Sequence, residues 1–245
     1  MAHDLPGPPW PPMASCWEDL FPLRPARVRM ALDWSREGQR TLDAGCATGS
    51  LVRALARQGR QAEGLDLEPT LLVVARDRAR AEGLELVWHQ LNLLEMERVG
   101  GVGQFALITC MGQTLPHLLE EREWQECFRQ MKTLLATGGH LILQVMNDGG
   151  APQAEPRELP LIQAPGGILR RWRSLLSPEL ACLETQFTPT GGMPVQSRVL
   201  HRRMEPGRTS LLLAQAGLHT RAIWGNEGGV PFTQDSGSWI LLAES

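Results

Sequence analysis

Short apolar runs alternate with longer amphipathic segments between Arg40 and about Asn147. Five of the apolar runs have the length and composition of buried strands, at residues 40–46, 62–67, 84–91, 105–111 and 140–147. Three of the longer segments carry apolar residues at helical spacing, at residues 50–59, 69–83 and 120–139. Because strands and helices alternate, the pattern predicts a parallel sheet with helices on both faces.

The pattern changes after Asn147. A Gly- and Pro-rich crossing leads into three strand-like runs joined by turn residues, at 168–176, 179–188 and 195–204, and these predict a small antiparallel meander. A helix at 207–218 follows, with Leu211, Leu212 and Ala216 on its expected apolar face, and then strands at 219–225 and 238–244. We therefore expect one domain over residues 16–245 with an antiparallel insertion at about 150–206, rather than two independent domains.

The first fifteen residues contain five prolines and have neither a basic nor an apolar signal-peptide region. They predict an extended, mobile N-terminal tail over residues 1–15. No apolar run approaches the roughly 20 residues of a membrane span. We expect a cytoplasmic protein that does not associate with membranes.

The composition disfavours several kinds of partner and site. The net charge of -3 and pI near 6.1 provide no positive field for nucleic acid, so a nucleic-acid partner is not expected. The five cysteines are odd in number and never in C-x-x-C spacing, which argues against a disulfide framework and a structural zinc site. We expect no metal. Tyrosine is absent, so no phenol is available as an acid or base.

The stretch LDAGCATGSL, residues 42–51, stands where the first strand meets the first helix. In open α/β sheets such a turn lines the ligand crevice. The dinucleotide fingerprint G-x-G-x-x-G/A fits poorly, because it leaves Gly49 without a role. The alternative pattern is an acidic residue followed by G-x-G-x-G with alanine at the middle position, and it fits Asp43, Gly45, Ala47 and Gly49.

Two further strand ends carry polar residues. Asp66 ends the second strand, 21 residues beyond Gly45, which is the usual distance for a carboxylate that accepts hydrogen bonds from ribose hydroxyls. Asp66 could also cap the helix that begins at Pro69. Asn92 follows the third strand, where an amide could contact an adenine amino group or serve as a plain turn residue.

This set of residues resembles motif I and the following strand ends of class I S-adenosylmethionine-dependent methyltransferases. The segment FALITCMGQTLPHLL after residue 104 is similar to the glycine/sarcosine N-methyltransferase-like small-molecule branch of that class. CWEDLFPL, LILQVMND, LRRWRS and the closing AGLHTRAIWGNEGGVPF extend the resemblance in chain order. It implies an α/β, Rossmann-like class I methyltransferase fold with a mixed seven-stranded sheet, helices on both faces and a small antiparallel lid insertion.

The resemblance also implies S-adenosyl-L-methionine as the cofactor and a small-molecule methyl acceptor, methylated on N or O. The expected cofactor-binding residues are Trp17, Asp43, Gly45, Ala47, Gly49, Asp66, Leu67, Asn92, Leu93, Cys110 and Met111. Glycine and sarcosine themselves are disfavoured as acceptors, because Met146 stands about where a carboxylate-binding arginine of that branch lies and the branch's substrate-facing tyrosines are missing.

Three residues are candidates for the catalytic site. His117 could be a general base or only a residue at the start of a helix. Gln113 could orient the acceptor or serve the loop. On the strand at 168–176, Ile168, Arg170 and Trp172 alternate onto one face, and an inward Arg170 would suit an anionic acceptor with a carboxylate or phosphate.

Other functions remain open at this point. The arginines of the insertion leave room for an RNA methyltransferase, although the acidic balance opposes it. The missing tyrosines and Met146 leave room for a catalytically inactive S-adenosylmethionine-binding relative. A nicotinamide-dependent oxidoreductase ranks last because of the glycine spacing.

Overall fold

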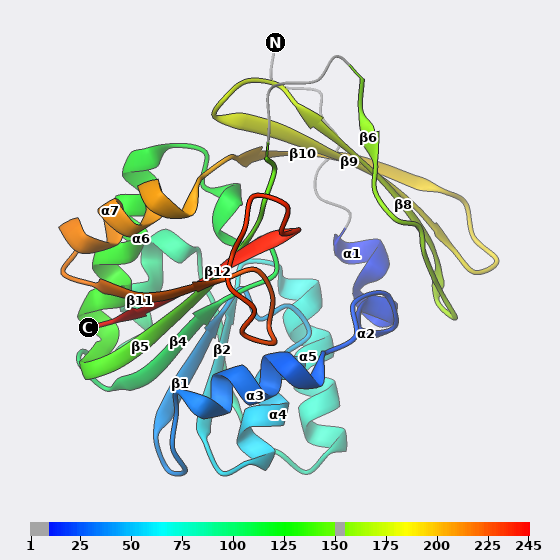
Figure 1. Cartoon of the computed structure of the whole chain (residues 1–245). Coiled ribbons are helices and arrows are strands. Elements are labelled where there is room, and N and C mark those ends of the chain that lie inside the picture. The colour runs from blue at the N-terminus through cyan, green and yellow to red at the C-terminus, as the bar shows by residue number, and fades with distance from the viewer. Residues whose placement is uncertain (1–9, 150–154) are drawn as a thin grey trace.

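The computed structural model describes residues 10–149 and 155–245, and its larger β-sheet has the strand order β11-β12-β5-β4-β1-β2-β3 (Figure 1). The seven strands are β1 (Arg40–Ala44), β2 (Gln61–Asp66), β3 (Val87–Gln90), β4 (Phe105–Cys110), β5 (Leu135–Met146), β11 (His219–Trp224) and β12 (Ser238–Glu244). Neighbours among β1 to β5 pair in parallel, whereas β12 runs antiparallel to both β5 and β11. The mixed seven-stranded sheet is therefore confirmed.

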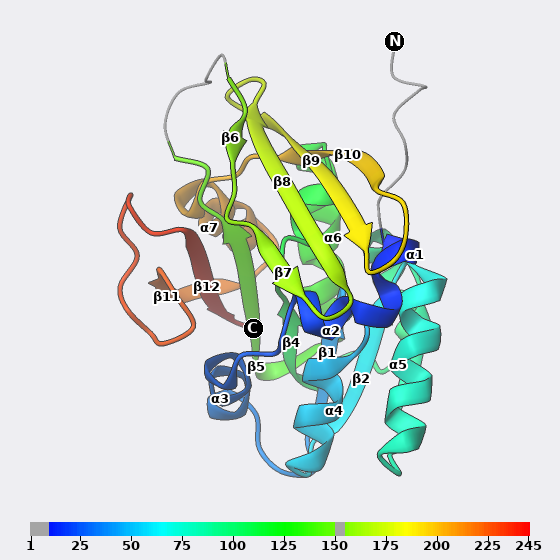
Figure 2. The ribbon, with the colours of Figure 1, turned by 90° about the vertical axis from the view of Figure 1, so that its right-hand side faces the viewer.

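Helices cover both faces of this sheet (Figures 1 and 2). They are α3 (Pro25–Asp33), α4 (Ser50–Arg57), α5 (Pro69–Ala81), α6 (Glu121–Leu134) and α7 (Pro206–Gln215). One hydrophobic cluster joins the sheet to α6 and α7, and a second joins it to α3, α4 and α5. Burial of these two apolar faces is the main force that holds the layers together.

Two details of the helices differ from the prediction. The helix expected over 120–139 ends at Leu134, because Leu135 already pairs with Phe105 in the sheet. In α7, Leu212 is buried and Ala216 packs against the core as expected, but Leu211 is exposed and Leu213 is buried in its place. In both places tertiary pairing and packing prevail over local periodicity.

A second, antiparallel sheet has the order β10-β9-β8-β6, with β7 also paired to β8. Its strands are β6 (Arg157–Glu158), β7 (Ile162–Ala164), β8 (Gly167–Leu175), β9 (Leu180–Pro189) and β10 (Val195–Arg202). The predicted meander is thus present, with two short strands added. This sheet stands over the carboxyl-terminal side of the main sheet (Figure 1), where His201 contacts His117 from the segment after β4.

The N-terminal segment differs from the expected extended tail. Residues 1–9 lie outside the described part of the chain, but Trp10–Met13 forms helix α1 and Ala14–Cys16 a 3-10 turn, followed by α2 (Trp17–Leu20). Met13 is buried against Leu169 and Phe187 of the antiparallel sheet. Apolar contacts therefore hold residues 10–15 in a helical conformation that the proline content did not indicate.

Candidate active site

The loop between β1 and α4 has a backbone that only small residues accommodate. Gly45 and Gly49 have φ angles of 84° and 72°, in the left-handed region that glycine adopts without strain. A Cβ at Gly45 would lie 2.3 Å from Thr114, and one at Gly49 would lie 2.2 Å from the Trp88 ring. The loop is therefore compressed between the segment after β4 and strand β3.

The amide groups of this loop are already occupied. Gly45 and Cys46 donate to the carbonyl of Leu65 at 2.7 and 2.9 Å. Ala47 donates to Oδ2 of Asp66 at 2.8 Å, and Gly49 donates to Cys46 at 2.8 Å. A pyrophosphate site needs free amide groups directed at the anion. This loop instead uses four of them to hold its own shape.

Two carboxylates lie at this end of the sheet. Asp43 is 8% exposed and accepts a hydrogen bond from Oγ1 of Thr109 at 2.7 Å. Burial raises the pKa of Asp43 to about 6, against the lowering effects of Thr109 and Arg27. Burial also raises the pKa of Asp66, and the charge of Asp66 raises the pKa of Asp43 by repulsion. Such a pair favours a cation or hydroxyl donors and opposes a diphosphate.

Asp66 does not cap helix α5. Its Oδ1 accepts from the amide of Glu68 at 2.9 Å, whereas the cap is Glu68, which accepts from Thr70. The carboxylate thus links the glycine loop to the segment after β2 and retains lone pairs for a ligand. Leu67, the next residue, is 61% exposed, an unusual exposure for an apolar side chain beside a polar crevice.

The expected residues on β3 and β4 take different places. Asn92 caps the 3-10 segment η2 (Leu93–Val99) by accepting from Leu94 at 2.9 Å, so the turn function is present and its amide nitrogen is left over. Leu93 and Met111 are buried near the strand ends. Cys110 is fully buried in the hydrophobic core, so its side chain does not line the crevice as predicted.

Helix α2 approaches the glycine loop from the other side. Trp17 contacts Trp10 and Phe21, with ring centroids 5.6 and 4.8 Å apart. Its neighbour Glu18 accepts from Oγ1 of Thr48 at 2.9 Å and from buried Arg53 at 2.8 Å. The link between Glu18 and Arg53 could not be predicted from the sequence, because no local spacing pairs residues 35 positions apart.

Arg27 of α3 is a further residue that the sequence analysis missed. It donates to Glu227 at 2.7 Å and to Gln144 at 3.0 Å. Gln144 in turn accepts from the amide of Gly112, after β4, at 3.3 Å. The charge of Arg27 lowers the pKa of Asp43, so helix α3 contributes to the electrostatics of the crevice.

The segment after β4 carries two of the predicted catalytic residues, Gln113 and His117. Gln113 has a φ of 73°, which is strained for a residue with a side chain. Its Oε1 accepts from the amide of Met146, whereas its buried Nε2 has no hydrogen-bond partner among the described residues. Gln113 therefore joins the ends of β4 and β5 and leaves one amide donor unused.

His117 ends the 3-10 turn η3 (Leu115–His117). Its ring lies 4.7 Å from that of His201 and 6.1 Å from that of Trp10. Burial among these groups, together with the charge of Arg173, lowers the pKa of His117 to about 4. Although these groups crowd its ring, His117 as a whole residue is exposed.

Arg170 is not on the inner face, and this prediction is wrong. Along β8, Leu169 and Arg173 are buried, while Ile168 and Arg170 are exposed. Because side chains alternate along a strand, Arg170 and Trp172 face away from the main sheet. Arg170 pairs at 3.7 Å with exposed Glu158. The alternation was predicted correctly, but the choice of inner face was inverted.

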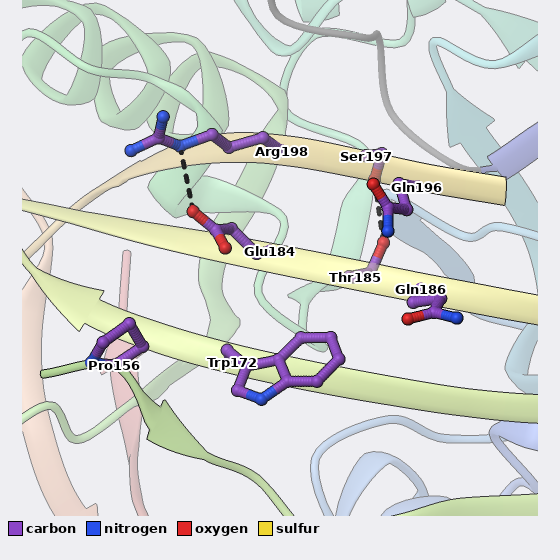
Figure 3. A pocket seen from close by; sticks show the side chains of 8 residues that line it. All are labelled: Pro156, Trp172, Glu184, Thr185, Gln186, Gln196, Ser197 and Arg198. Carbon is purple, nitrogen blue, oxygen red and sulfur yellow. Dashed lines mark hydrogen bonds and ion pairs between the residues drawn. The ribbon is translucent and has the colours of Figure 1, made fainter.

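A shallow hollow of about 430 Å³ lies on this outer face (Figure 3). Its lining includes Trp172, Gln186, Gln196 and the ion pair of Glu184 with Arg198. The hollow is separated from Asp43 and His117 by the antiparallel sheet itself. It is therefore not part of the crevice.

Comparisons with known proteins show which proteins this chain is similar to. Residues 41–139 match the family described as "Methyltransferase domain". This part of the chain is therefore similar to a methyltransferase domain. A ubiquinone biosynthesis O-methyltransferase of Alkalilimnicola ehrlichii is 31% identical over 141 residues, covering 56% of the chain and 54% of that protein. The chain thus spans about half the length of the curated relatives that it matches.

Solved structures show that the methyltransferase fold extends beyond the matched residues. The CcbJ methyltransferase of Streptomyces caelestis has a TM-score of 0.81 at 19% identity, covering 95% of this chain and 96% of that one. An amino pentose methyltransferase of Micromonospora echinaspora has a TM-score of 0.65 at 21% identity, covering 97% and 92%. The domain and its antiparallel sheet therefore have the Rossmann-like fold of class I methyltransferases.

Within residues 10–149 and 155–245, no group of three or more His, Cys, Asp or Glu side chains could hold a metal ion. No helix within those ranges is long and apolar enough to cross a membrane.

Proposed function

We propose that this protein is an S-adenosylmethionine-dependent methyltransferase that transfers a methyl group in line to a nitrogen or oxygen of a small molecule. The observation that carries the proposal is the arrangement of Asp43 and Asp66 around a glycine loop whose amides are internally bonded. This arrangement matches a nucleoside with an ammonium group and two ribose hydroxyls better than a diphosphate.

Each wall of the crevice has a function in this proposal. Asp43 attracts the ammonium group, and Asp66 accepts hydrogen bonds from the ribose hydroxyls. Exposed Leu67 and the amide of Asn92 border the space for the adenine, and Trp17 closes it from helix α2. When bound, S-adenosylmethionine supplies an electrophilic methyl group on a sulfonium.

The protein's task at the acceptor is positioning and exclusion of water, because the methyl group is already activated. Gln113 and His117 form the acceptor wall. With a pKa near 4, His117 is uncharged at neutral pH and accepts a hydrogen bond, but it is a weak base. This suits an acceptor that needs orientation more than deprotonation, such as a neutral amine.

The chain order of motifs supports a place beside the glycine/sarcosine N-methyltransferase-like branch, with a different acceptor because Met146 replaces the arginine. The argument for an anionic acceptor rested on Arg170, which lies on the outer face. Small-molecule acceptors are in keeping with relatives and neighbours named for ubiquinone biosynthesis and amino pentose methylation.

Calorimetry with S-adenosylhomocysteine tests the proposal directly. The wild type should bind it, and Asp66→Ala should weaken binding at least tenfold, since two hydrogen-bonded hydroxyls lose their partner. Asp77→Ala, a change of the 67%-exposed carboxylate on α5, is the matched control and should bind as the wild type does. Binding of NAD in place of S-adenosylhomocysteine would contradict the proposal.

A further inference from the structure

A buried cluster on the inner face of the antiparallel sheet lies beside His117. Arg173 and Asp148 have side chains that are only 2% and 7% exposed. The guanidinium forms two parallel hydrogen bonds with the carboxylate, Nε to Oδ1 at 2.8 Å and Nη2 to Oδ2. Asp148 follows β5 and Arg173 lies on β8, so this ion pair connects the main sheet to the antiparallel sheet.

The third edge of the guanidinium faces a histidine. Nη1 of Arg173 lies 2.6 Å from Nδ1 of His201 on β10. Arginine has donors and no acceptor, so Nδ1 of His201 must accept this hydrogen bond. His201 is therefore an uncharged imidazole whose single proton is on Nε2.

That remaining N–H group is unpaired. His201 is 2% exposed, and its Nε2 has no hydrogen-bond partner among the described residues. Its ring is nearly perpendicular to that of His117, with centroids 4.7 Å apart. A buried donor without an acceptor is unfavourable, and here it adjoins the ring of exposed His117.

Gln113 supplies a second donor of the same kind, because its Nε2 is also buried and unpaired while its Oε1 is held by Met146. The nearby carboxylate of Asp148 is neutralised by Arg173. The acceptor wall thus presents N–H donors and an uncharged histidine. A ligand with oxygen acceptors would satisfy the donors without introducing a net charge.

We propose that Arg173 is a positioning residue of the acceptor site, which fixes His201 as the Nε2–H tautomer and directs that donor to a neutral oxygen of the methyl acceptor. This inference rests on the proposed methyltransferase function. Its ligand class is a molecule with a hydroxyl, ether or carbonyl oxygen near the methylated atom.

Nitrogen-15 spectra of the imidazole rings test the first step without any turnover. The His201 signals, assigned by their loss in His201→Gln, should show the Nε2–H tautomer and no titration between pH 6 and 8. In Arg173→Lys, the charge opposite Asp148 is kept but the donor to Nδ1 is lost, so the tautomers should mix. An Nδ1–H tautomer in the wild type, or no change in Arg173→Lys, would overturn the assignment.

Two matched amines test the second step on protein saturated with S-adenosylhomocysteine. Trans-2-aminocyclohexanol should shift the His201 N–H signal, whereas cyclohexylamine, which lacks the hydroxyl, should not. In titrations, His201→Leu should reduce the preference for the amino alcohol about tenfold, the value of one hydrogen bond. His201→Gln keeps a donor near the Nε2 position and should retain the preference.

The controls separate the two proposals. If S-adenosylhomocysteine does not bind the wild type, the proposed function fails first. If it binds equally well to the wild type, His201→Leu and Arg173→Lys, the cofactor site is intact. In that case, equal responses to the two amines, or no response to either, would overturn the inference alone.

Discussion

Oγ1 of Thr48 in the glycine loop donates a hydrogen bond to Glu18 of helix α2, 2.9 Å away. Glu18 also holds the buried guanidinium of Arg53 and pairs with Arg78 of α5 at 2.7 Å. One carboxylate therefore connects the N-terminal helix to the loop at the centre of the proposed cofactor site. Burial raises the pKa of Glu18, but the bonds from both arginines outweigh it and the net shift is downward.

We expect Glu18→Gln to loosen helix α2 and to weaken cofactor binding. The amide would leave buried Arg53 without its full partner, at a cost of about 1–3 kcal/mol in unfolding free energy. Limited proteolysis after α2 should become faster, and S-adenosylhomocysteine should protect less. Asp19→Asn, an exposed carboxylate of the same helix, is the control. Unchanged proteolysis and affinity in Glu18→Gln would show that α2 is independent of the loop.

The glycine loop predicts a difference between two Gly→Ala substitutions with the same backbone strain. Gly49 and Gly83 have φ angles of 72° and 70°. Only at Gly49 would a new Cβ meet a neighbour, the ring of Trp88 at 2.2 Å, whereas Gly83 has nothing within 4 Å. Gly83→Ala should cost about 1 kcal/mol, and Gly49→Ala a further 1–3 kcal/mol.

Urea denaturation measures both changes, and calorimetry with S-adenosylhomocysteine measures the consequence for the site. Gly49→Ala should also lower the affinity, because the displaced Trp88 lies against the loop. Gly83→Ala should leave the affinity unchanged. Equal destabilisation by the two substitutions would mean that the loop is not compressed as described.

The main sheet could be predicted from the sequence because each of its strands is a short apolar run with a clear stop. The ends of these strands also indicated that Asp43 and Asp66 lie at the same edge of the sheet, where the charge of Asp66 acts on Asp43. Helix α3 and the strands β6 and β7 were missed, since their apolar content is weak or their length is two or three residues. Helix α1 was missed because prolines conceal its contacts with the antiparallel sheet.

The cluster of Arg173, Asp148 and His201 could not be predicted in the same way. Arg170 and Arg173 belong to the same arginine-rich strand, and periodicity places them on opposite faces without indicating which face is buried. Arg173 is on the buried face because of two residues on other elements. Asp148 neutralises its charge, and His201 accepts a hydrogen bond from it. Long-range pairing of this kind leaves no local signal.

Asp43→Asn is expected to stabilise the ligand-free protein while it weakens the site. Burial holds the pKa of Asp43 at about 6, above the ordinary aspartate value of 3.8. The folded state therefore binds more protons than the unfolded state between these values, and stability falls as pH rises from about 4 to 6. At pH 7 the amide should add up to about 3 kcal/mol of unfolding free energy.

Denaturation at pH 7 and at pH 4.5 distinguishes this effect from general repacking, because the gain should be smaller at the lower pH. Calorimetry should show at least a tenfold loss of affinity for S-adenosylhomocysteine, whose ammonium group loses its charged partner. Asp77→Asn should change neither property. A gain that is the same at both pH values would argue against a carboxylate that is costly to ionise.

His117 should make the opposite contribution to the pH dependence. Burial and the charge of Arg173 lower its pKa to about 4 from 6.5, so the unfolded state takes up a proton first as the pH falls. The contribution of His117 is present above pH 6.5 and is lost between about 6.5 and 4. His117→Asn removes this loss, and the difference in unfolding free energy between pH 7.5 and 4.5 should shrink relative to the wild type. His219→Asn, at an exposed histidine on β11, is the control in the same urea series.

The pH dependence of the initial rate of methyl transfer tests the same group. Because His117 is already uncharged near neutrality, this rate should show no inflection near pH 6.5. An inflection there that disappears in His117→Asn would mean that His117 titrates as an ordinary histidine and acts as the base.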